Sequence, residues 1–248
     1  MLRIRGLGKS FGGRPVLTDV DLDGRAGEFV AVLGANGSGK STALRCVIGL
    51  ERPDAGDIHI GDTDVTRLRG ADLVRARRQA AMVFQKIYLV GRRSALDNVC
   101  AGALGRLPLR QSLTPMLFPH DLRQEAMACL DRVGLADRAA EPARRLSGGQ
   151  QQRVAIARAL CQRARVVLAD EPVSALDPAA AEQVVSLLAE LARDGLAVVA
   201  VLHQPELARR HADRVVGLLH GRVALDAPAA TVGADDIDRL YAPERGQS

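Results

Sequence analysis

Hydrophobic positions change their spacing along this chain. Before residue 94, short apolar runs typical of strands dominate, with helical spacing at 40–50 and 69–78. The strands expected there are residues 2–7, 15–22, 28–33, 56–60 and 80–84. A glycine-rich turn at 34–39 separates the third strand from the first helix.

The middle of the chain has a different pattern. Apolar residues recur at helical spacing in 94–105, 120–134 and 150–161, whereas the proline-containing stretch 107–119 is expected to be irregular. Strands are expected again at 166–169, 196–202, 214–219 and 222–225, with a helix at 178–193. The whole chain, 1–248, is therefore predicted to be one α/β domain. Its core is expected at 1–93 and 161–226, with a helical insert at 94–160 and a tail at 227–248.

Length and composition narrow the class of protein. The 248 residues suit a single domain, and 47% hydrophobic with 25% charged residues excludes disordered and fibrous chains. No apolar run approaches the ~18 residues that a membrane helix needs. No apolar signal-peptide core follows the first residues. We therefore expect a chain that neither spans a membrane nor is exported.

Charged residues and cysteines exclude further classes. The net charge of +5 comes from arginines spread along the chain, and aromatic residues make up only 2%, so nucleic acid is not an expected partner. Only Lys9, Lys40 and Lys86 are lysines, which makes a retained lysine a candidate for chemistry that arginine cannot do. The cysteines lie far apart and the histidines form no cluster, which indicates buried thiols and no zinc site.

The glycine-rich turn carries a motif for binding phosphate. Residues 34–41 read GANGSGKS, the GxxxxGK[ST] pattern, between a strand and a helix. Glycines let backbone N–H groups approach phosphate oxygens at a helix N-terminus. Lys40 is expected to reach the β- and γ-phosphates and Ser41 to ligate Mg²⁺. By itself the motif predicts only a nucleoside triphosphate, because kinases and GTPases share it.

Two more segments add acidic and anion-binding groups. The apolar strand 166–169 runs into Asp170 and Glu171, at the edge of a parallel sheet where ligands bind. Asp170 is expected to hold Mg²⁺ and Glu171 to orient or deprotonate the attacking water. Residues 146–150 read LSGGQ, in which Ser147 is expected to cap a helix whose first N–H groups form a second anion site. Two such helix starts suggest that both bind one nucleotide.

With these motifs the chain resembles the nucleotide-binding subunits of ATP-binding-cassette (ABC) transporters over nearly its whole length. Gln85 ends a strand as the family's glutamine loop does, residues 174–177 read SALD like the D-loop, and His203 takes the position of the switch histidine. Phe11 stands where the family has an aromatic residue stacked on adenine. The resemblance implies a P-loop NTPase (RecA-like) core with an N-terminal antiparallel β part and an inserted helical subdomain.

The resemblance also implies an ATPase that uses ATP and Mg²⁺ and works as a head-to-tail homodimer. Each ATP would lie between the phosphate loop of one copy and the LSGGQ of the other. The implied catalytic residues are Lys40, Gln85, Glu171 and His203, and the implied metal-site residues are Ser41, Gln85 and Asp170. The implied ATP contacts are Phe11, Gly34, Ala35, Asn36, Gly37, Ser38, Gly39, Lys40, Ser41, Thr42, Ser147, Gly148, Gly149, Gln150 and Asp177.

Within this family the chain is most similar to importer subunits. Repair ATPases carry a coiled coil between the phosphate loop and LSGGQ, which the prolines at 108, 115 and 119 do not fit. Translation factors carry two cassettes, too many for this length. The segments YLVGR at 88–92, GRL at 105–107 and RQSL at 110–113 resemble the ATPases of phosphonate importers, although KIY at 86–88 and Arg93 depart from them.

This likeness implies ATP hydrolysis coupled to phosphonate uptake at the cytoplasmic face of the inner membrane. The implied partners are a second copy of the chain, permease subunits and, indirectly, a periplasmic substrate-binding protein. Importers of phosphate, methionine or polar amino acids remain alternatives, as does a soluble ABC ATPase of repair or assembly.

Overall fold

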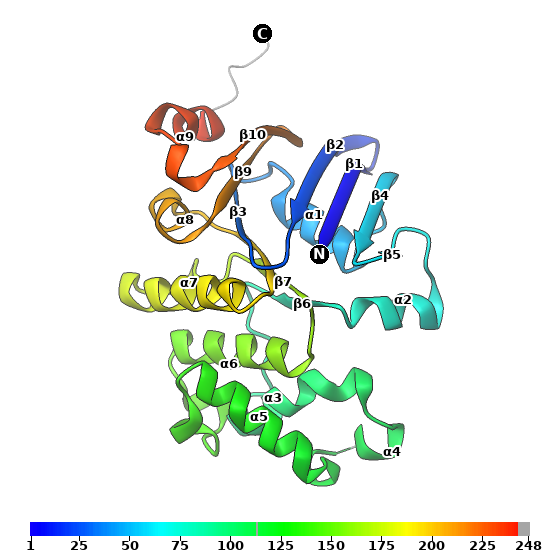
Figure 1. Cartoon of the computed structure of the whole chain (residues 1–248), viewed down its shortest axis with the longest axis vertical. Coiled ribbons are helices and arrows are strands. Elements are labelled where there is room, and N and C mark those ends of the chain that lie inside the picture. Colours follow the sequence, from blue (N-terminus) through cyan, green and yellow to red (C-terminus); the bar gives the residue numbers. More distant parts are fainter. Residues whose placement is uncertain (113, 243–248) are drawn as a thin grey trace.

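The computed structural model describes residues 1–112 and 114–242 and contains two β-sheets (Figure 1). Position 113 of the RQSL segment and residues 243–248 of the predicted tail lie outside the described residues. The smaller sheet is antiparallel, with the order β2-β1-β4-β5. Its strands are β1 (Leu2–Phe11), β2 (Arg14–Gly24), β4 (Ala55–Ile60) and β5 (Thr63–Asp64).

The larger sheet has the order β10-β9-β3-β8-β7-β6, and its neighbours pair in parallel except for β10 with β9. Its strands are β3 (Phe29–Leu33), β6 (Ala80–Val83), β7 (Val166–Asp170), β8 (Ala197–Val201), β9 (Arg214–Leu219) and β10 (Arg222–Pro228). The loops after β3, β7 and β8 therefore meet at one edge of this sheet.

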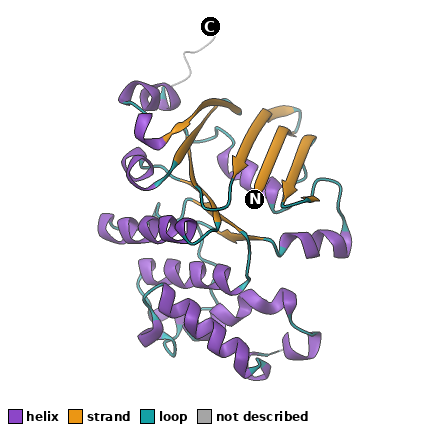
Figure 2. Cartoon of the chain, in the orientation of Figure 1, coloured by secondary structure: helices purple, strands orange, loops and turns teal. Residues whose placement is uncertain are grey.

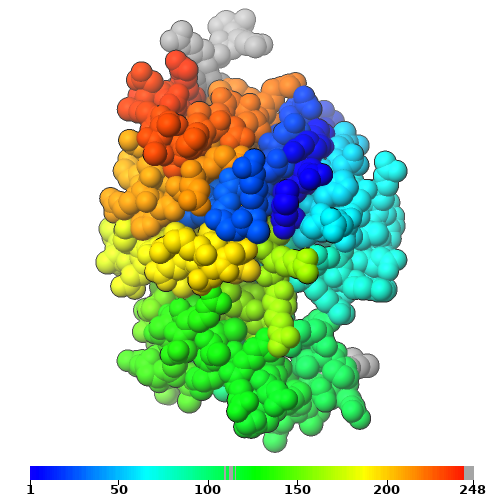
Figure 3. All heavy atoms as spheres, viewed as in Figure 1, coloured from blue at the N-terminus to red at the C-terminus, as the bar shows by residue number. Residues whose placement is uncertain are grey.

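The α-helices either pack against the larger sheet or pack mainly against one another beside it. They are α1 (Lys40–Val47), α2 (Gly70–Arg77), α3 (Ala95–Cys100), α4 (Leu109–Ser112), α5 (His120–Arg132), α6 (Gly148–Cys161), α7 (Pro178–Arg193), α8 (Pro205–His211) and α9 (Ala234–Tyr241). Figure 2 shows the strands gathered in the upper part of the molecule, with a helical lower part. In Figure 3 this lower end is formed by the green segment, which contains α3, α5 and α6.

The larger sheet is buried on both faces, which explains its uninterrupted apolar strands. In β3, Phe29, Ala31 and Leu33 join the core shared with the helices of the lower part. The intervening Val30 and Val32 join a second core, formed with α1 and the smaller sheet. Because successive side chains point to opposite faces of a strand, β3 takes part in both cores.

The predicted α/β class is confirmed, while several boundaries differ. Helix α1 ends at Val47 rather than at residue 50, because Gly49 adopts φ of +63° and the Leu50 N–H bonds back to the Arg45 carbonyl. The stretch 107–119, expected to be irregular, contains α4 and the 3-10 turn Pro115–Leu117.

Proline accounts for part of these differences, because it is tolerated in the first turn of a helix. Pro108 directly precedes α4, and Pro205 opens α8, which was not predicted. Strand β10 continues to Pro228, past the residue at which a tail was predicted to begin. No helix in the described part of the chain is long and apolar enough to cross a membrane.

Candidate functional site

The phosphate-binding loop connects β3 to α1 at the edge of the larger sheet. Gly34 has φ of +142°, and a Cβ there would clash with the carbonyl oxygen of Leu218 in β9. Lys40, at the start of α1, is 4% exposed. Its Nζ donates to the carbonyl oxygens of Gly34 and Ala35, each at 2.8 Å, and to Ser38 Oγ at 3.4 Å. The loop thus folds around its own lysine.

The Lys40 ammonium is a buried charge near two carboxylates. Burial lowers the pKa of Lys40, and the nearby carboxylates of Glu171 and Asp170 partly oppose this effect. A buried cation interacts more strongly with an incoming anion than a hydrated one does. The loop is therefore suited to bind a phosphate group.

A hydroxyl and a carboxylate lie directly beside the lysine. Ser41 Oγ donates to Asp170 Oδ1 at 2.6 Å, joining α1 to the end of β7. Burial raises the pKa of Asp170, and the Ser41 hydrogen bond opposes the rise. These oxygens are of the type that Mg²⁺ prefers, and Mg²⁺ commonly takes its other ligands from phosphates and water. Residues 1–112 and 114–242 contain no group of three or more His, Cys, Asp or Glu side chains that could hold a metal.

Glu171 and His203 form the next pair along the same sheet edge. Glu171 Oε1 lies 2.7 Å from His203 Nε2, so the loops after β7 and β8 are in contact. Glu171 has φ of +51°, a conformation that is costly for a residue other than glycine and often found at functional sites. Glu171 lines the same cavity as residues of the phosphate-binding loop.

A serine connects Gln85 to this pair. Gln85 Nε2 donates to Ser174 Oγ at 3.1 Å, and the Ser174 hydroxyl donates to the Glu171 carbonyl oxygen at 3.2 Å. Ser174 was predicted only as the first residue of the SALD segment and not as a site residue. Its connecting position depends on the approach of β6 to β7, which the motif does not encode.

A cavity of about 300 Å³ gathers seven of the fifteen predicted ATP contacts. Its lining residues are Phe11, Val16, Asn36, Gly37, Gly39, Lys40, Ser41, Thr42 and Glu171. Phe11 is 45% exposed, and Lys9 Nζ lies 5.0 Å from its ring centroid, within the range of a cation–π contact. Lys9 was not predicted as a site residue, although the scarcity of lysine had singled it out.

The LSGGQ segment forms the start of α6, and its residues do not line this cavity in the described structure. Ser147 Oγ accepts from the Gln150 N–H at 3.3 Å, and Gln150 Oε1 accepts from the Ser147 N–H at 2.9 Å. This capping box confirms Ser147 as the helix cap and uses the Gln150 side chain for the same purpose. Asp177 Oδ1 accepts from the Ala180 N–H at 2.9 Å, so Asp177 caps α7.

One chain therefore separates the predicted contacts into two groups. The phosphate-binding loop, Phe11, Asp170 and Glu171 lie together, whereas Ser147 starts a helix that packs beside α7: a Cβ on Gly149 would lie 3.0 Å from Ala180 Cβ. The sequence profile of the family described as ABC transporter matches residues 17–174, which include the phosphate-binding loop, the LSGGQ segment, Asp170 and Glu171.

The chain belongs to the ABC transporter family.

Curated members of the family extend over almost the same length. The phosphonates import ATP-binding protein PhnC of Frankia casuarinae is 50% identical, over 97% of this chain and 93% of its own length. The phosphate-import ATP-binding protein PhnC of Mycolicibacterium smegmatis is 48% identical, over 96% of this chain and 90% of its own length. The hypophosphite import ATP-binding protein HtxD of Stutzerimonas stutzeri is 43% identical, over 99% and 72%. The predicted likeness to phosphonate-importer ATPases is confirmed.

Solved ABC cassettes share the fold. The dimeric cassette MJ0796, in a post-hydrolysis state with ADP and Pi, is 34% identical, with a TM-score of 0.77 over 92% of this chain and 99% of that one. The cassette cbiO1 from Clostridium perfringens is 27% identical, with a TM-score of 0.82 over 96% of this chain and 92% of that one. The predicted P-loop NTPase architecture is confirmed, and ATP is the nucleotide that ABC cassettes bind.

Proposed function

We propose that this chain is the ATP-hydrolysing subunit of an importer for phosphorus oxyanions, with phosphonates as the first candidates. The observation that carries the proposal is the 50% identity to a phosphonates import protein over 97% of the chain. The names of other relatives mention phosphate and hypophosphite, which share the phosphorus–oxygen chemistry of phosphonates. The phosphate importer foreseen from sequence therefore becomes the second candidate.

The substrate is tested in the assembled transporter. The chain is co-expressed with a membrane permease and a substrate-binding protein, and ATPase activity is measured with that protein loaded by phosphonate, phosphate or hypophosphite. Stimulation by the phosphonate-loaded protein supports the proposal, whereas stimulation by phosphate or hypophosphite alone reassigns the substrate. Failure to co-purify with any permease from detergent would favour a soluble ABC ATPase.

For hydrolysis, we assign the phosphate-binding loop, residues 34–42, to the triphosphate and Phe11 to the adenine ring. Support comes from the cavity that Phe11, Thr42 and the loop residues line together. Lys40 would keep its hydrogen bond to the Gly34 carbonyl and exchange the Ala35 carbonyl and the Ser38 hydroxyl for β- and γ-phosphate oxygens. Ser41 and Asp170 would hold Mg²⁺, which neutralises phosphate charge when bound, and the family resemblance adds Gln85 as a third ligand.

Glu171 and His203 would act on the attacking water and the γ-phosphate. A carboxylate at the end of β7 can accept a hydrogen bond from water and remove its proton. His203, 2.7 Å from Glu171, would hold that carboxylate until nucleotide arrives and then donate to the γ-phosphate. Gln85 would sense the occupied site through Ser174, because that hydroxyl bonds to the Glu171 backbone.

The second group of contacts would come from another copy of the chain. In one chain, Ser147, Gly148, Gly149, Gln150 and Asp177 do not line the nucleotide cavity. The capping box leaves the hydroxyl hydrogen of Ser147 free to donate, because Ser147 Oγ only accepts in it. In a head-to-tail homodimer, this helix start would face the γ-phosphate bound by the other copy.

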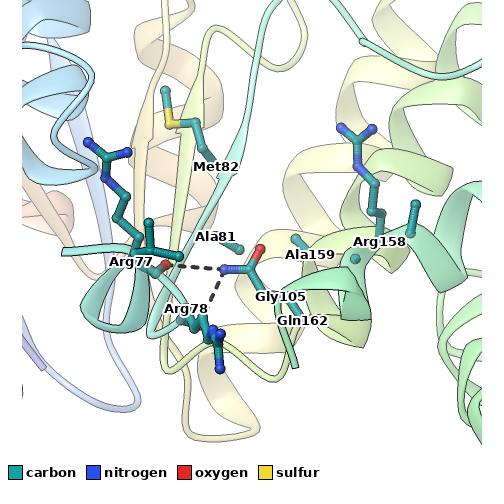
Figure 4. Close-up of a pocket in the computed structure, with 11 residues that line it drawn as sticks. Arg77, Arg78, Ala81, Met82, Gly105, Arg158, Ala159 and Gln162 are labelled. Carbon is teal, nitrogen blue, oxygen red and sulfur yellow. Dashed lines mark hydrogen bonds between the residues drawn. The ribbon is translucent and has the colours of Figure 1, made fainter. Parts of the chain in front are cut away.

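We also propose that the core at 1–93 and 161–226 and the insert at 94–160 act as two parts, with a permease docking between them. A pocket of about 420 Å³ lies where α2, β6 and α6 meet the 3-10 turn Ala101–Arg106 (Figure 4). Figure 4 shows Arg77 and Arg158 on opposite sides of it, and Gln162 bonded to the carbonyls of Arg77 and Arg78.

The charge and exposure around this pocket suit a protein partner. Burial lowers the pKa of Arg158, with no carboxylate of the described residues opposing it, and Arg158 donates to the Tyr88 carbonyl at 2.7 Å. Val74, which lines the pocket, is a large apolar residue that stays exposed, and so is Leu104 of the turn Ala101–Arg106. The chain would thus be peripheral, held by permease subunits at the cytoplasmic face of the membrane.

This docking proposal has its own test. Arg78→Glu should reduce recovery of the permease with the chain from detergent, while leaving MgATP binding by the chain unchanged. Arg75→Glu is the matched control, since Arg75 lies on α2 three residues before Arg78, faces solvent and pairs with Asp72 at 3.3 Å. Equal recovery with both variants would place the permease elsewhere.

A further inference from the structure

We infer that helix α9 is a support of the phosphate-binding loop, and that Leu240 acts as a positioning residue for Lys40. This inference rests on the proposed role of Lys40 in ATP binding. Helix α9 lies next to β9 and β10, at the end of the described chain (Figure 1). No motif in the sequence assigns a function to this segment.

The contact joins two segments that are far apart in the sequence. The carbonyl oxygen of Leu240 accepts a hydrogen bond from the Ala35 N–H at 3.3 Å. Ala35 is the second residue of the GANGSGKS motif. A backbone group of α9 thus binds directly to the loop that is assigned to the triphosphate.

The bonded N–H belongs to the peptide group whose carbonyl holds Lys40. The Gly34 carbonyl and the Ala35 N–H are opposite ends of one planar peptide. The carbonyl end accepts from Lys40 Nζ at 2.8 Å, and the N–H end donates to Leu240. Rotation of this peptide would break both hydrogen bonds. Leu240 therefore fixes the orientation of the carbonyl that places the lysine, and the two bonds polarise each other favourably.

Side-chain packing holds the Leu240 carbonyl in place. Leu240 is 1% exposed, and a Cβ added to Gly217 of β9 would lie 2.5 Å from Leu240 Cδ1. The absence of a side chain at Gly217 thus makes room for Leu240. Burial also raises the pKa of Tyr241, whose ring packs against the main core while its hydroxyl is buried without a hydrogen-bond partner among the described residues. The end of α9 is anchored next to the first two residues of the loop.

The rest of the loop does not rest on α9 in the same way. A cavity of about 540 Å³ lies beside the middle of the loop, and Asn36, Ser38 and Tyr241 are among its lining residues. Support by α9 is thereby concentrated at the Gly34–Ala35 peptide. The middle of the loop stays free to close around phosphate, while the lysine anchor is fixed.

The experiment compares Leu240→Ala with wild type in the full chain. MgATP affinity is measured by displacement of a fluorescent ATP analogue, and KM and kcat by ATPase assay. Loss of one oriented hydrogen bond predicts an affinity about threefold to tenfold weaker and a similar rise in KM, with kcat at saturation retained. Amide hydrogen exchange at Ala35 should become faster. Leu240→Met, which conserves volume, should restore all three quantities.

The control is Asp238→Ala, an exposed position of the same helix, which should change neither affinity nor exchange. A lower melting temperature of Leu240→Ala with wild-type KM and wild-type Ala35 exchange would overturn the inference, since α9 would then be only a structural element. If Leu240→Ala does not fold, amide exchange in the wild-type protein tests the inference by itself. The Ala35 amide must be protected without nucleotide, and exchange at the rate of an unstructured amide overturns the inference.

Lys40→Ala separates this inference from the proposed function. If Lys40→Ala leaves MgATP binding intact, the assignment of the triphosphate site itself is wrong. If Lys40→Ala abolishes binding while Leu240→Ala has no effect, only the role of α9 is wrong.

Discussion

Two helix starts in this chain have the form of phosphate-binding sites, but they are supported differently. The start of α1 is enclosed: Lys40 is 4% exposed, β9 and α9 contact the loop before it, and Asp170 bonds to Ser41. The start of α6 is open, with Ser147 and Gly148 exposed and its cap made from its own residues.

This difference indicates that the two sites have different roles. The α1 site is preorganised by the buried sheet behind it, so one chain should bind MgATP by itself. The α6 site has an ordered backbone but little surrounding structure, and it should contribute only when another surface brings a phosphate to it. Dimer formation would then be the step that completes the catalytic site.

The largest effect is expected for Glu171→Gln. The amide retains the shape but cannot take a proton from water, so turnover should fall by about 100-fold or more. MgATP binding at the α1 site should persist, and the ATP-bound dimer should be stable enough to appear in size-exclusion chromatography. Glu190→Gln, an exposed position on α7, is the control. Near-normal hydrolysis by Glu171→Gln would show that another group activates the water.

The next prediction tests whether the two sites come from different copies. Lys40→Ala damages the α1 site and Gly149→Asp damages the α6 site, since it adds a carboxylate where phosphate is expected. Each variant alone should be inactive, but Gly149→Asp should still bind MgATP. An equal mixture should recover about a quarter of wild-type activity, because half of the dimers regain one of two sites. An inactive mixture would contradict the head-to-tail arrangement.

A smaller effect concerns Asp170, whose pKa is raised by burial. An acid with a raised pKa in the folded state destabilises the fold as pH rises from the ordinary aspartate range through that raised value. Asp170→Asn should therefore raise the melting temperature at neutral pH, by about 2–4 °C per kcal/mol recovered, while abolishing Mg²⁺-dependent hydrolysis.

Melting curves without nucleotide, recorded from acidic to neutral pH, provide the measurement. Wild type should lose stability relative to Asp170→Asn as pH rises, and the exposed control Asp57→Asn should behave like wild type. A lower melting temperature for Asp170→Asn at neutral pH would mean that the Ser41 hydrogen bond outweighs desolvation.

The smallest effect compares cysteines of the two regions. Burial raises the pKa of Cys46 in α1 and of Cys100 in α3 to about 11, so both should react slowly with iodoacetamide at pH 8. MgATP at ten times its Kd should slow modification of Cys46 about tenfold, because opening of α1 releases the ligand. The rate of Cys100 modification should change less. Equal protection, measured by mass spectrometry, would show that both regions open together.

Local sequence patterns predicted the phosphate-binding segments of this chain better than they predicted its short helices and strands. GANGSGKS and LSGGQ depend on residues only a few positions apart, and the structure forms the expected loop and helix cap. Helix α8 and the two-residue strand β5 were missed, because segments of this size give little periodicity to count. The roles of Ser174 and Leu240 were missed because their partners lie on other elements.

The sequence by itself determined the family, the α/β class and the residue types available for binding phosphate. Only the tertiary structure decided which of those residues meet: Ser41 with Asp170, Glu171 with His203, and Ala35 with Leu240. The physical reason is that these contacts depend on the strand order β10-β9-β3-β8-β7-β6. Hydrophobic periodicity shows which face of a strand is buried, but it does not specify which strand lies beside it.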